Sequence, residues 1–367
     1  MNPLDFAKFL KEHIGIFAGV PDSLLKPLNS ALSATLDTRD FYTCANEGQA
    51  VAFASAYNLA TKKLGAVYMQ NSGLGNAINP LLSLSDELVY KIPLVLFIGL
   101  RGGDNDEPQH KKQGLVTRGI LDACGISNFI LSNELDKAKE QCLVAFKECL
   151  EKSKIIAILI EKGTFETFKD NEAIEQDDSK LTREESISIV QDAFKNAKFV
   201  STTGMISREH YELRELKGVG HENDFLVVGS MGFASSIAYI LSCYTKEKIV
   251  CLDGDGAFLM HMGALSNFRD SSFIHIVFNN FAHDSVGGQS TNALNVNFVK
   301  IAESCGYKKA YRVRDSIELQ QLLESIKNKN ELIFIEVLVK KGARKDLGRP
   351  CEILKLKEAF CAKLAEL

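Results

Sequence analysis

The sequence predicts an α/β protein with two open, mainly parallel sheets, each covered by helices. Three observations lead to this fold class. The chain has 367 residues, more than one hydrophobic core usually serves. Short apolar runs rich in Val, Ile and Phe alternate with longer stretches of helical character, a rhythm typical of parallel sheets covered by helices. A polar, acidic segment divides these runs into two series. We therefore expect two α/β domains.

The apolar runs predict strands in both series. In the first half we expect strands near residues 15–17, 65–69, 94–99 and 155–160. In the second half we expect them near residues 199–202, 225–228, 249–252, 274–278 and 332–339.

The boundary between the predicted domains lies in the stretch TFETFKDNEAIEQDDSK, residues 164–180. It is acidic and poor in long apolar runs, which suits a surface linker. Immediately after it, TREE carries the pattern of a helix capping box, with Thr182 as N-cap and Glu185 three residues on. We expect a first domain over 1–165, a linker over 166–181 and a second domain over 182–367.

Composition narrows the classes of function. Hydrophobic residues make up 46% of the chain and charged residues 25%, and the formal net charge is −4, so nothing favours a nucleic-acid partner. The nine cysteines form no CxxC pair and resemble reduced cytosolic thiols. No window approaches the apolar length of a membrane span, and the first residues lack the pattern of a secretory signal. We expect a cytoplasmic protein with no membrane or nucleic-acid partner.

The segment CLDGDG, residues 251–256, is the most informative in the chain. It predicts a strand that runs into a tight turn, where Gly254 and Gly256 allow a close approach of ligand to backbone. Asp255 then lies at the carboxyl end of a strand and beside a helix N-terminus, where open parallel sheets bind ligands and phosphates. The next strand delivers Asn280 to the same edge.

A carboxylate and an amide oxygen from neighbouring strand ends form half of a hard-oxygen site, which suits Mg²⁺ that already holds two phosphate oxygens. The backbone carbonyl of Ala282 is a candidate for a further ligand. The plainer interpretation is a strand-to-helix turn with an N-cap aspartate, followed by an asparagine pair that opens a loop.

The stretch from Gly254 to Asn280 resembles the diphosphate and magnesium motif of thiamine diphosphate enzymes, at the short end of its usual spacing. The resemblance continues in both halves. CANEGQAVAFASAYNLATKK resembles the helix whose glutamate activates the cofactor's aminopyrimidine, which implies this role for Glu47. VVGSMGFASSIAYIL resembles the segment that supplies a backbone carbonyl and an apolar support to the bent cofactor, roles that fall on Gly229 and Met231. Taken singly, Glu47 could be a first-turn helix glutamate and Met231 a core residue.

Other segments resemble the phosphonopyruvate decarboxylases, with the sulfopyruvate decarboxylases as the nearest relatives. They are FAGVPDSLLKPL, VYMQNSGLGNAINPLLSL, DEPQHKKQG, TTGMISREHYELRE, HDSVGGQST and RKDLGRP. Like those enzymes, the chain leaves no room for a middle domain between its halves. The resemblance implies non-oxidative decarboxylation of 3-phosphonopyruvate to phosphonoacetaldehyde and CO₂, with sulfopyruvate as the alternative substrate and an acetolactate synthase-like carboligase as a weaker third reading.

A small anionic 2-oxo acid needs cations near the reacting carbon, because its charges are costly to desolvate. The candidates for binding it are Arg101, Lys112 and Arg208. Asp22 resembles a proton-transferring acid of related decarboxylases, and His110 is a second candidate for proton transfer. Each of these residues also has a plain reading, as a solvated surface charge or, for Asp22, as a helix cap.

The resemblance also implies at least a homodimer, with active sites at subunit interfaces. Two other classes compete with this interpretation. A non-catalytic subunit of the same fold would be expected to have lost Glu47 or the Asp255 and Asn280 pair, and all three are present. A dinucleotide-binding dehydrogenase could use Gly73 and Gly75, but Ile78 stands where the third glycine of that motif belongs.

Overall fold

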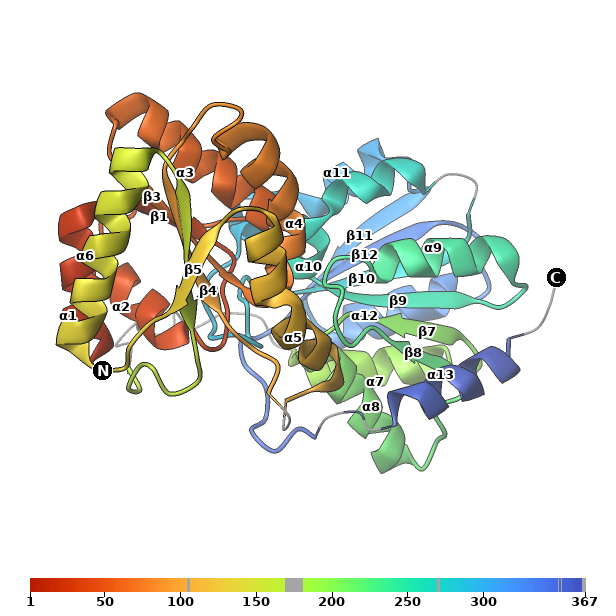
Figure 1. The fold of residues 1–367 in the computed structure, drawn as a ribbon. Coiled ribbons are helices and arrows are strands. Elements are labelled where there is room, and N and C mark those ends of the chain that lie inside the picture. The colour runs from red at the N-terminus through yellow and green to blue at the C-terminus, as the bar shows by residue number, and fades with distance from the viewer. Residues whose placement is uncertain (104–105, 169–180, 269–270, 349, 351, 365–367) are drawn as a thin grey trace. The chain divides into compact units, whose positions relative to one another are not determined.

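The computed structural model describes residues 1–103, 106–168, 181–268, 271–348, 350 and 352–364. It divides into two compact units, Met1–Ile174 and Glu175–Leu367 (Figure 1). Most of the linker expected at 166–181 lies outside the described residues. The capping box expected after it is confirmed, because Thr182 and Glu185 bond each other's backbone N–H groups at the start of α7.

The first unit is built on a parallel sheet of six strands in the order β2-β1-β3-β4-β6-β5. The strands are β1 (Ile14–Gly19), β2 (Phe41–Thr43), β3 (Leu64–Gln70), β4 (Leu94–Gly99), β5 (Ser127–Ile130) and β6 (Ile155–Ile160). The inner strands β3, β4 and β6 are buried along almost their whole length, which explains their unbroken apolar sequences.

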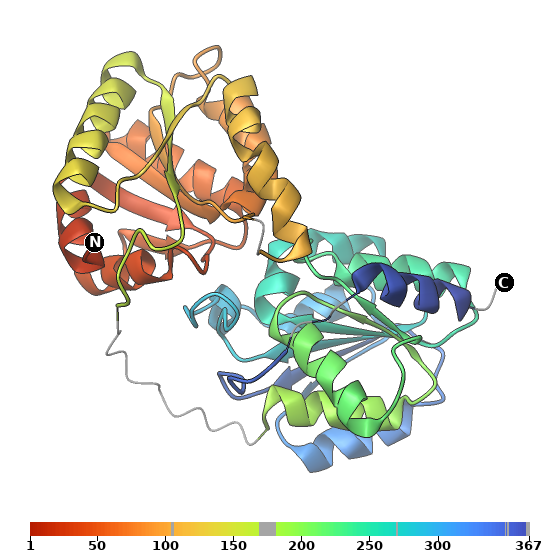
Figure 2. The ribbon, with the colours of Figure 1, turned by 60° about the horizontal axis from the view of Figure 1, so that its bottom comes forward.

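Helices cover both faces of this sheet (Figure 2). One face packs against α1 (Pro3–His13), α2 (Lys26–Thr35) and α6 (Leu135–Lys152). The other packs against α3 (Glu47–Thr61), α4 (Leu74–Pro80) and α5 (Pro108–Ala123). Short helical turns, η1 (Asn71–Gly73) and η2 (Leu81–Ser85), flank α4.

The second unit repeats this plan with a parallel sheet in the order β11-β12-β10-β9-β7-β8. Its strands are β7 (Lys198–Ser201), β8 (Asp224–Leu226), β9 (Ile249–Gly254), β10 (Phe273–Asn279), β11 (Lys309–Val313) and β12 (Ile333–Leu338). The helices α7 (Arg183–Ala193), α8 (Met205–Lys217) and α12 (Ser316–Ile326) pack on one face. The helices α9 (Ala234–Tyr244), α10 (Asp255–Met260) and α11 (Phe298–Ser304) pack on the other. Helix α13 (Ile353–Ala362) contacts β8 through Phe360 and Phe225, and η3 (Met262–Asn267) and η4 (Asn292–Asn295) are short turns.

The predicted fold class is confirmed: the chain has two parallel α/β sheets, and no further folded unit lies between them in the described residues. All nine predicted strands are present. The sequence missed β2, β5 and β11, and all three are edge strands. An edge strand is covered less completely, so its sequence lacks the continuous apolar run that marks an inner strand; β11, for example, is KAYRV.

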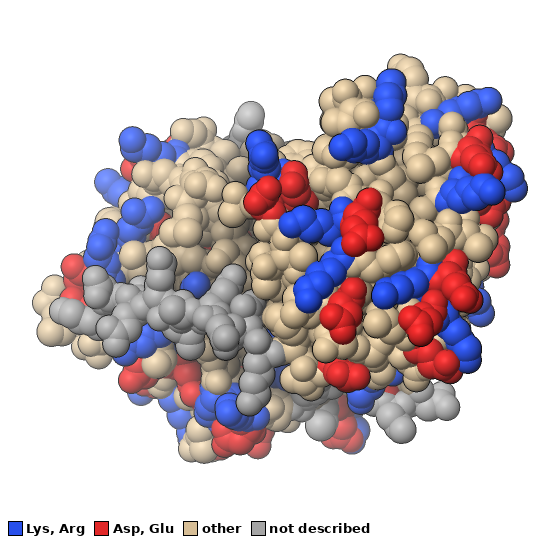
Figure 3. Space-filling model, turned by 90° about the vertical axis from the view of Figure 1, so that its left-hand side faces the viewer, with Lys and Arg blue, Asp and Glu red and all other residues tan. Residues whose placement is uncertain are grey.

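On the face drawn in Figure 3, Lys and Arg side chains alternate with Asp and Glu, and among the described residues shown there neither sign forms a broad region. On this face, an anionic ligand would therefore be held by local groups rather than by a wide surface potential. None of the described helices combines the length and the apolar character that crossing a bilayer requires.

Candidate active site

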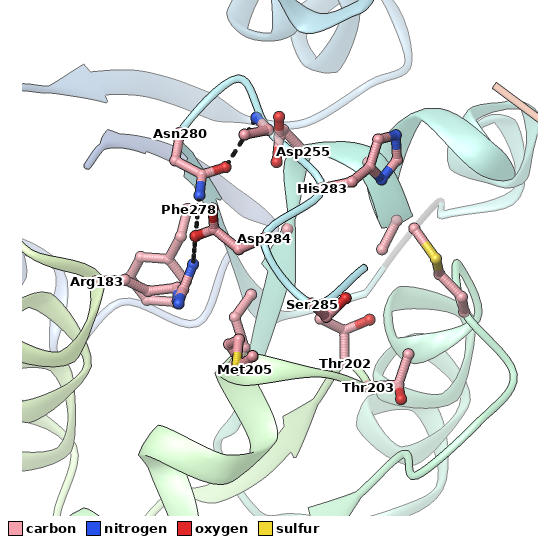
Figure 4. Close-up of a pocket in the computed structure, with 16 residues that line it drawn as sticks. Arg183, Thr202, Thr203, Met205, Asp255, Phe278, Asn280, His283, Asp284 and Ser285 are labelled. Carbon is pink, nitrogen blue, oxygen red and sulfur yellow. Dashed lines mark hydrogen bonds and ion pairs between the residues drawn. The ribbon is translucent and has the colours of Figure 1, made fainter. Parts of the chain in front are cut away.

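A cavity of about 70 Å³ opens in the second unit beside the carboxyl ends of β7, β9 and β10 (Figure 4). Six residues singled out in the sequence border it: Met231, Gly254, Asp255, Gly256, Asn280 and Ala282. The remaining lining residues are Arg183, Thr202, Thr203, Met205, Ile206, Ala257, Phe278, His283, Asp284 and Ser285. Because parallel strands end at a common edge, segments far apart in the sequence meet here.

Asp255 is the first residue of α10 and is only 3% exposed. The hydroxyl of Thr291 donates a hydrogen bond of 2.5 Å to its Oδ2 atom. Burial raises the pKa of the Asp255 carboxyl to about 7, although the Thr291 hydroxyl and the backbone N–H of Gly256 act in the opposite direction. A bound cation would stabilise the ionised carboxylate and counteract this desolvation.

Asn280 follows β10 directly and is 2% exposed. Its Oδ1 atom accepts the backbone N–H of Ala282 at 3.1 Å, and its Nδ2 donates to Oδ2 of Asp284 at 2.5 Å. Asp284 is in turn held by Arg183, whose Nη1 lies 2.8 Å from the same oxygen. Figure 4 shows this chain of contacts along one wall of the cavity.

At both glycines of the Gly-Asp-Gly turn, an added side chain would crowd a neighbouring residue. A Cβ atom at Gly256 would lie 2.7 Å from Cε1 of His283, and one at Gly254 would lie 3.2 Å from Ile206. Met231 follows Ser230, whose φ of 44° is unusual for a residue with a side chain, and precedes Gly232 at φ 87°. This loop directs Met231 toward Gly256, where its methyl group would be 3.4 Å from an added Cβ.

The groups at this edge fit a hard divalent cation that carries phosphate. Asp255 supplies a carboxylate, Asn280 an amide oxygen and Ala282 a backbone carbonyl, which are the ligand types that Mg²⁺ prefers. The N-terminus of α8, which follows Thr202, Thr203 and Gly204, borders the same cavity with N–H groups suited to phosphate. The chain thus offers oxygen ligands for a metal and N–H donors for a diphosphate.

In the first unit, Glu47 begins α3 after the N-cap Asn46 and is 4% exposed. Its Oε2 accepts a hydrogen bond of 2.8 Å from Nδ2 of Asn76. Burial raises the pKa of the Glu47 carboxyl, and the bond from Asn76 acts in the opposite direction. Gly73 lies against this side chain so closely that an added Cβ would be 2.1 Å from Oε1. The carboxyl group is therefore confined between Gly73 and Asn76.

Asp22 follows β1 and has no exposed surface. Its Oδ2 accepts the backbone N–H groups of Leu24 and Leu25 at 3.1 and 3.3 Å, so the side chain does cap a turn. Its Oδ1 is buried without a hydrogen-bond partner among the described residues. Burial raises the pKa of Asp22 to about 6, against the opposing effects of those N–H groups and of Arg101. Gly99, at the end of β4, would clash with Oδ2 if it carried a Cβ atom.

Arg101, predicted to bind substrate, is paired within its own unit. Its Nε and Nη2 donate to Asp106 at 3.1 and 2.5 Å, and Nη1 donates to Ser23 at 3.2 Å. His110 lies on α5 close to Asp106 and Glu107. One ring nitrogen of His110 and one carboxylate oxygen of each acid lie within 4.8 Å of one another. An anionic substrate that bound Arg101 would compete with the Asp106 carboxylate.

Three further predicted residues do not border the cavity. Lys112 is exposed on α5, Arg208 is half-buried on α8, and Gly229 precedes the Met231 loop; none of the three borders the cavity of the second unit.

Sequence reasoning gave no individual role to Arg183, nor to Thr202, Thr203 and Glu209 within the quoted segment TTGMISREHYELRE. The two threonines carry a signal in retrospect, because they follow a strand and precede a glycine and a helix, like the Gly-Asp-Gly turn. Arg183 had no such signal, since it stands in the first turn of α7 as an ordinary polar residue. NSGLGNA, considered as a dinucleotide-binding loop, instead runs from η1 into α4 and carries Gly73 against Glu47.

Comparison with known proteins gives consistent results for the two halves. Residues 5–119 match the thiamine pyrophosphate enzyme N-terminal TPP binding domain, and residues 200–337 match the C-terminal TPP binding domain. A protein named phosphonopyruvate decarboxylase from Streptomyces hygroscopicus is 30% identical to the chain over 353 residues, which are 91% of this chain and 86% of that protein. A protein of the same name from Streptomyces viridochromogenes is 29% identical over 353 residues, which are 91% of this chain and 87% of that protein. A protein named sulfopyruvate decarboxylase from Methanosarcina acetivorans is 26% identical over 312 residues, 75% of each chain.

Proposed function

The chain belongs to the thiamine pyrophosphate enzymes, and from that premise we propose that it decarboxylates 3-phosphonopyruvate to phosphonoacetaldehyde and CO₂ with thiamine diphosphate and Mg²⁺ as cofactors. The observation that carries the proposal is the likeness over nearly the whole chain to proteins named phosphonopyruvate decarboxylase. Glu47 falls within the matched N-terminal domain, and Asp255 and Asn280 fall within the matched C-terminal domain.

Bound thiamine diphosphate would supply the electron sink that a 2-oxo acid needs in order to lose CO₂. Asp255, Asn280 and the carbonyl of Ala282 would hold the Mg²⁺ that anchors its diphosphate. Gly254 and Gly256 would let the phosphates approach the backbone. Gly229 would supply a carbonyl, and Met231 would supply an apolar support for the bent cofactor.

Glu47 would hold a proton at its carboxyl group and donate it in a hydrogen bond to the aminopyrimidine ring. Its burial and raised pKa support this role, because desolvation favours the protonated acid. Asp22 would move the proton that replaces CO₂ on the product carbon, and its raised pKa of about 6 keeps part of the population protonated near neutral pH. His110 is the second candidate for this transfer.

Arg101, Lys112 and Arg208 would pair with the carboxylate and phosphonate of the substrate. For Arg101, this requires the substrate to replace the Asp106 carboxylate as its partner. The alternative substrate is sulfopyruvate, which the likeness to the Methanosarcina protein favours and which presents a similar tetrahedral anion. An acetolactate synthase-like carboligation is the third candidate.

The proposal includes at least a homodimer, with active sites at subunit interfaces and a location in the cytoplasm. Sedimentation of the purified chain with both cofactors tests the assembly. A monomer that retained full activity would contradict it.

Activity is tested with the purified chain, thiamine diphosphate and Mg²⁺, offered phosphonopyruvate, sulfopyruvate and pyruvate in separate assays that follow aldehyde release. We expect the highest kcat/KM with phosphonopyruvate. A higher kcat/KM with sulfopyruvate would make sulfopyruvate the preferred substrate. A preference for pyruvate would overturn the proposed recognition of the second anion. A parallel assay for acetolactate tests carboligation.

A further inference from the structure

Asn279, the last residue of β10, and Asn280, which follows it, are held by two similar chains of contacts. Asn280 donates its Nδ2 to Asp284, and Arg183 donates to the same carboxylate oxygen at 2.8 Å. Asn279 donates its Nδ2 to Glu336 at 2.8 Å, and Glu336 accepts from Arg312 at 2.7 Å. Each asparagine thus faces a carboxylate that an arginine holds.

The two asparagines also make the same local turn. Oδ1 of Asn280 accepts the backbone N–H of Ala282 at 3.1 Å, and Oδ1 of Asn279 accepts that of Phe281 at 3.0 Å. Asparagine side chains commonly bond the backbone two residues on in this way. Their hydrogen bonding therefore gives no reason to distinguish them.

Their surroundings do distinguish them. Asn280, Asp284 and Arg183 all border the cavity that also contains Asp255, as Figure 4 shows. Asn279 and Glu336 do not border that cavity. Of the two similar chains of contacts, one therefore lies at the predicted metal site and the other lies in the sheet beside it.

Asp284 is anchored from several segments that are distant in the sequence. Its Oδ2 accepts from Arg183, from Asn280 and, at 3.1 Å, from the backbone N–H of Gly342. The guanidinium of Arg183 is 5% exposed and makes a two-point contact with Glu209, with distances of 2.7 and 2.9 Å. Such two-point pairs restrict the geometry of both groups. Asp284 is thus held in one position from α7, α8 and the segment after β12.

This arrangement determines which way the Asn280 amide faces. An ionised carboxylate accepts hydrogen bonds and cannot donate them, so Asp284 requires the NH₂ group of Asn280 on its side. The amide oxygen then turns away from Asp284. Mg²⁺ binds an amide through its oxygen, so the reversed amide would present the wrong atom.

We propose that Asp284, held by Arg183 and Glu209, is a positioning residue that orients the Asn280 amide as a ligand of Mg²⁺. The inference rests on the proposed magnesium site and extends it to Asp284, Arg183 and Glu209, which are not among its predicted ligands. Groups that orient metal ligands commonly change metal affinity 10- to 100-fold when they are substituted.

The test is the substitution Asp284→Asn in the full chain with saturating thiamine diphosphate. The probe is Mn²⁺, whose free concentration is read from its electron paramagnetic resonance signal. An asparagine at 284 can donate as well as accept, so it no longer selects one orientation of Asn280, and only the backbone N–H of Ala282 still favours the present one. We expect Mn²⁺ affinity to fall about 10- to 100-fold.

Glu336→Gln is the matched control, because it makes the same change of charge beside Asn279. We expect it to lower the melting temperature while it leaves Mn²⁺ affinity within about two-fold of the wild type. Equal losses of affinity in the two variants would indicate general loosening of the end of β10 and would overturn the inference. So would unchanged affinity in Asp284→Asn when the wild type binds Mn²⁺.

A wild-type chain that bound no Mn²⁺ with the cofactor present would overturn the metal site itself, and the inference with it. If Asp284→Asn does not fold by circular dichroism, Arg183→Lys decides the question. Lysine keeps the charge but cannot contact Asp284 and Glu209 through one planar group. A fall of at least about three-fold in Mn²⁺ affinity supports the proposal, and an unchanged value contradicts it.

Discussion

Each unit contains a buried acid whose pKa is raised by burial, and the surroundings of the two acids differ. Glu47 in the first unit and Asp255 in the second each begin a helix beside the carboxyl end of a parallel sheet, and burial raises the pKa of both. Around Glu47 the contacts are neutral: the amide of Asn76 on one side and the backbone of Gly73 on the other. Around Asp255 the cavity also holds Asp284 and Arg183.

The difference in surroundings separates two kinds of chemistry. A buried acid among neutral groups keeps its proton, because nothing nearby compensates its charge. A buried acid among other oxygen ligands is ready for a cation, which compensates the charge when it binds. We therefore interpret the first unit as the half that handles a proton and the second as the half that binds the metal. Five substitutions, one of them with a matched control, test this interpretation.

Glu47→Gln should have the largest effect on turnover. The amide has almost the shape of the acid but cannot exchange a proton, so we expect kcat to fall about 10³-fold, within the range of general acid–base catalysis. Cofactor affinity, measured by calorimetry, should change by less than about three-fold. Near-normal kcat would remove the proposed role of Glu47.

Asp255→Ala should weaken cofactor binding, whereas Glu47→Gln should mainly reduce turnover. Loss of a metal ligand should weaken binding of thiamine diphosphate and Mg²⁺ together by at least about 100-fold. Calorimetric titration of the variant with both cofactors measures this, and a melting curve checks that the fold is intact. Wild-type affinity in this variant would show that the metal binds elsewhere.

Gly73→Ala should impair Glu47 without unfolding the protein. The added Cβ would lie 2.1 Å from Oε1, 2.6 Å from Cδ and 2.8 Å from Cγ of Glu47, so the Glu47 side chain would have to shift. A displacement of about 1 Å at a reacting group can cost about 100-fold in rate, so we expect kcat to fall 10- to 100-fold.

The control for Gly73→Ala is Gly75→Ala, two residues along the same segment. An added Cβ there meets nothing within 4 Å. We expect normal kcat and a small gain in stability, because alanine favours a helix by about 1 kcal/mol over glycine. If both variants lost activity equally, contact with Glu47 could not be the reason.

Asp22→Asn should stabilise the protein at the cost of activity. The pKa of Asp22 rises from 3.8 to about 6 on folding, so between these values the folded state holds a proton that the unfolded state has lost. The free energy of unfolding contributed by this group therefore falls as pH rises from about 4 to 6, by up to about 3 kcal/mol.

Asparagine at position 22 removes that pH dependence. Urea denaturation at pH 4.5 and pH 8 should show that the stability of the variant relative to the wild type increases with pH. A difference that stayed constant between the two pH values would contradict a raised pKa at Asp22.

Thr291→Val should have the smallest effect. It removes the hydroxyl that donates to Asp255 at 2.5 Å but keeps the shape of the side chain. We expect Mn²⁺ affinity to fall about three- to ten-fold, since the carboxylate loses one group that orients it. A loss as large as that of Asp255→Ala would mean that Thr291 itself binds the metal.

The sequence by itself was sufficient to predict the sheet interiors and the Gly-Asp-Gly turn. An inner strand must be apolar on both faces, so β4 and β6 are visible as continuous runs, LVLFIG and IIAILI. The Gly-Asp-Gly turn is a local feature whose residues lie next to one another in the chain. Such patterns need no knowledge of distant contacts.

Only the tertiary structure could reveal the edge strands and the contacts between residues that are distant in the sequence. The edge strand β11 lacks an apolar run because sheet neighbours lie on one side of it alone. Arg183 and Asp284 are separated by 101 residues, and Gly73 lies 26 residues beyond Glu47 on a different helical segment. A contact between such positions leaves no mark in either local sequence, because it exists only when the folded sheet brings the two segments to one edge.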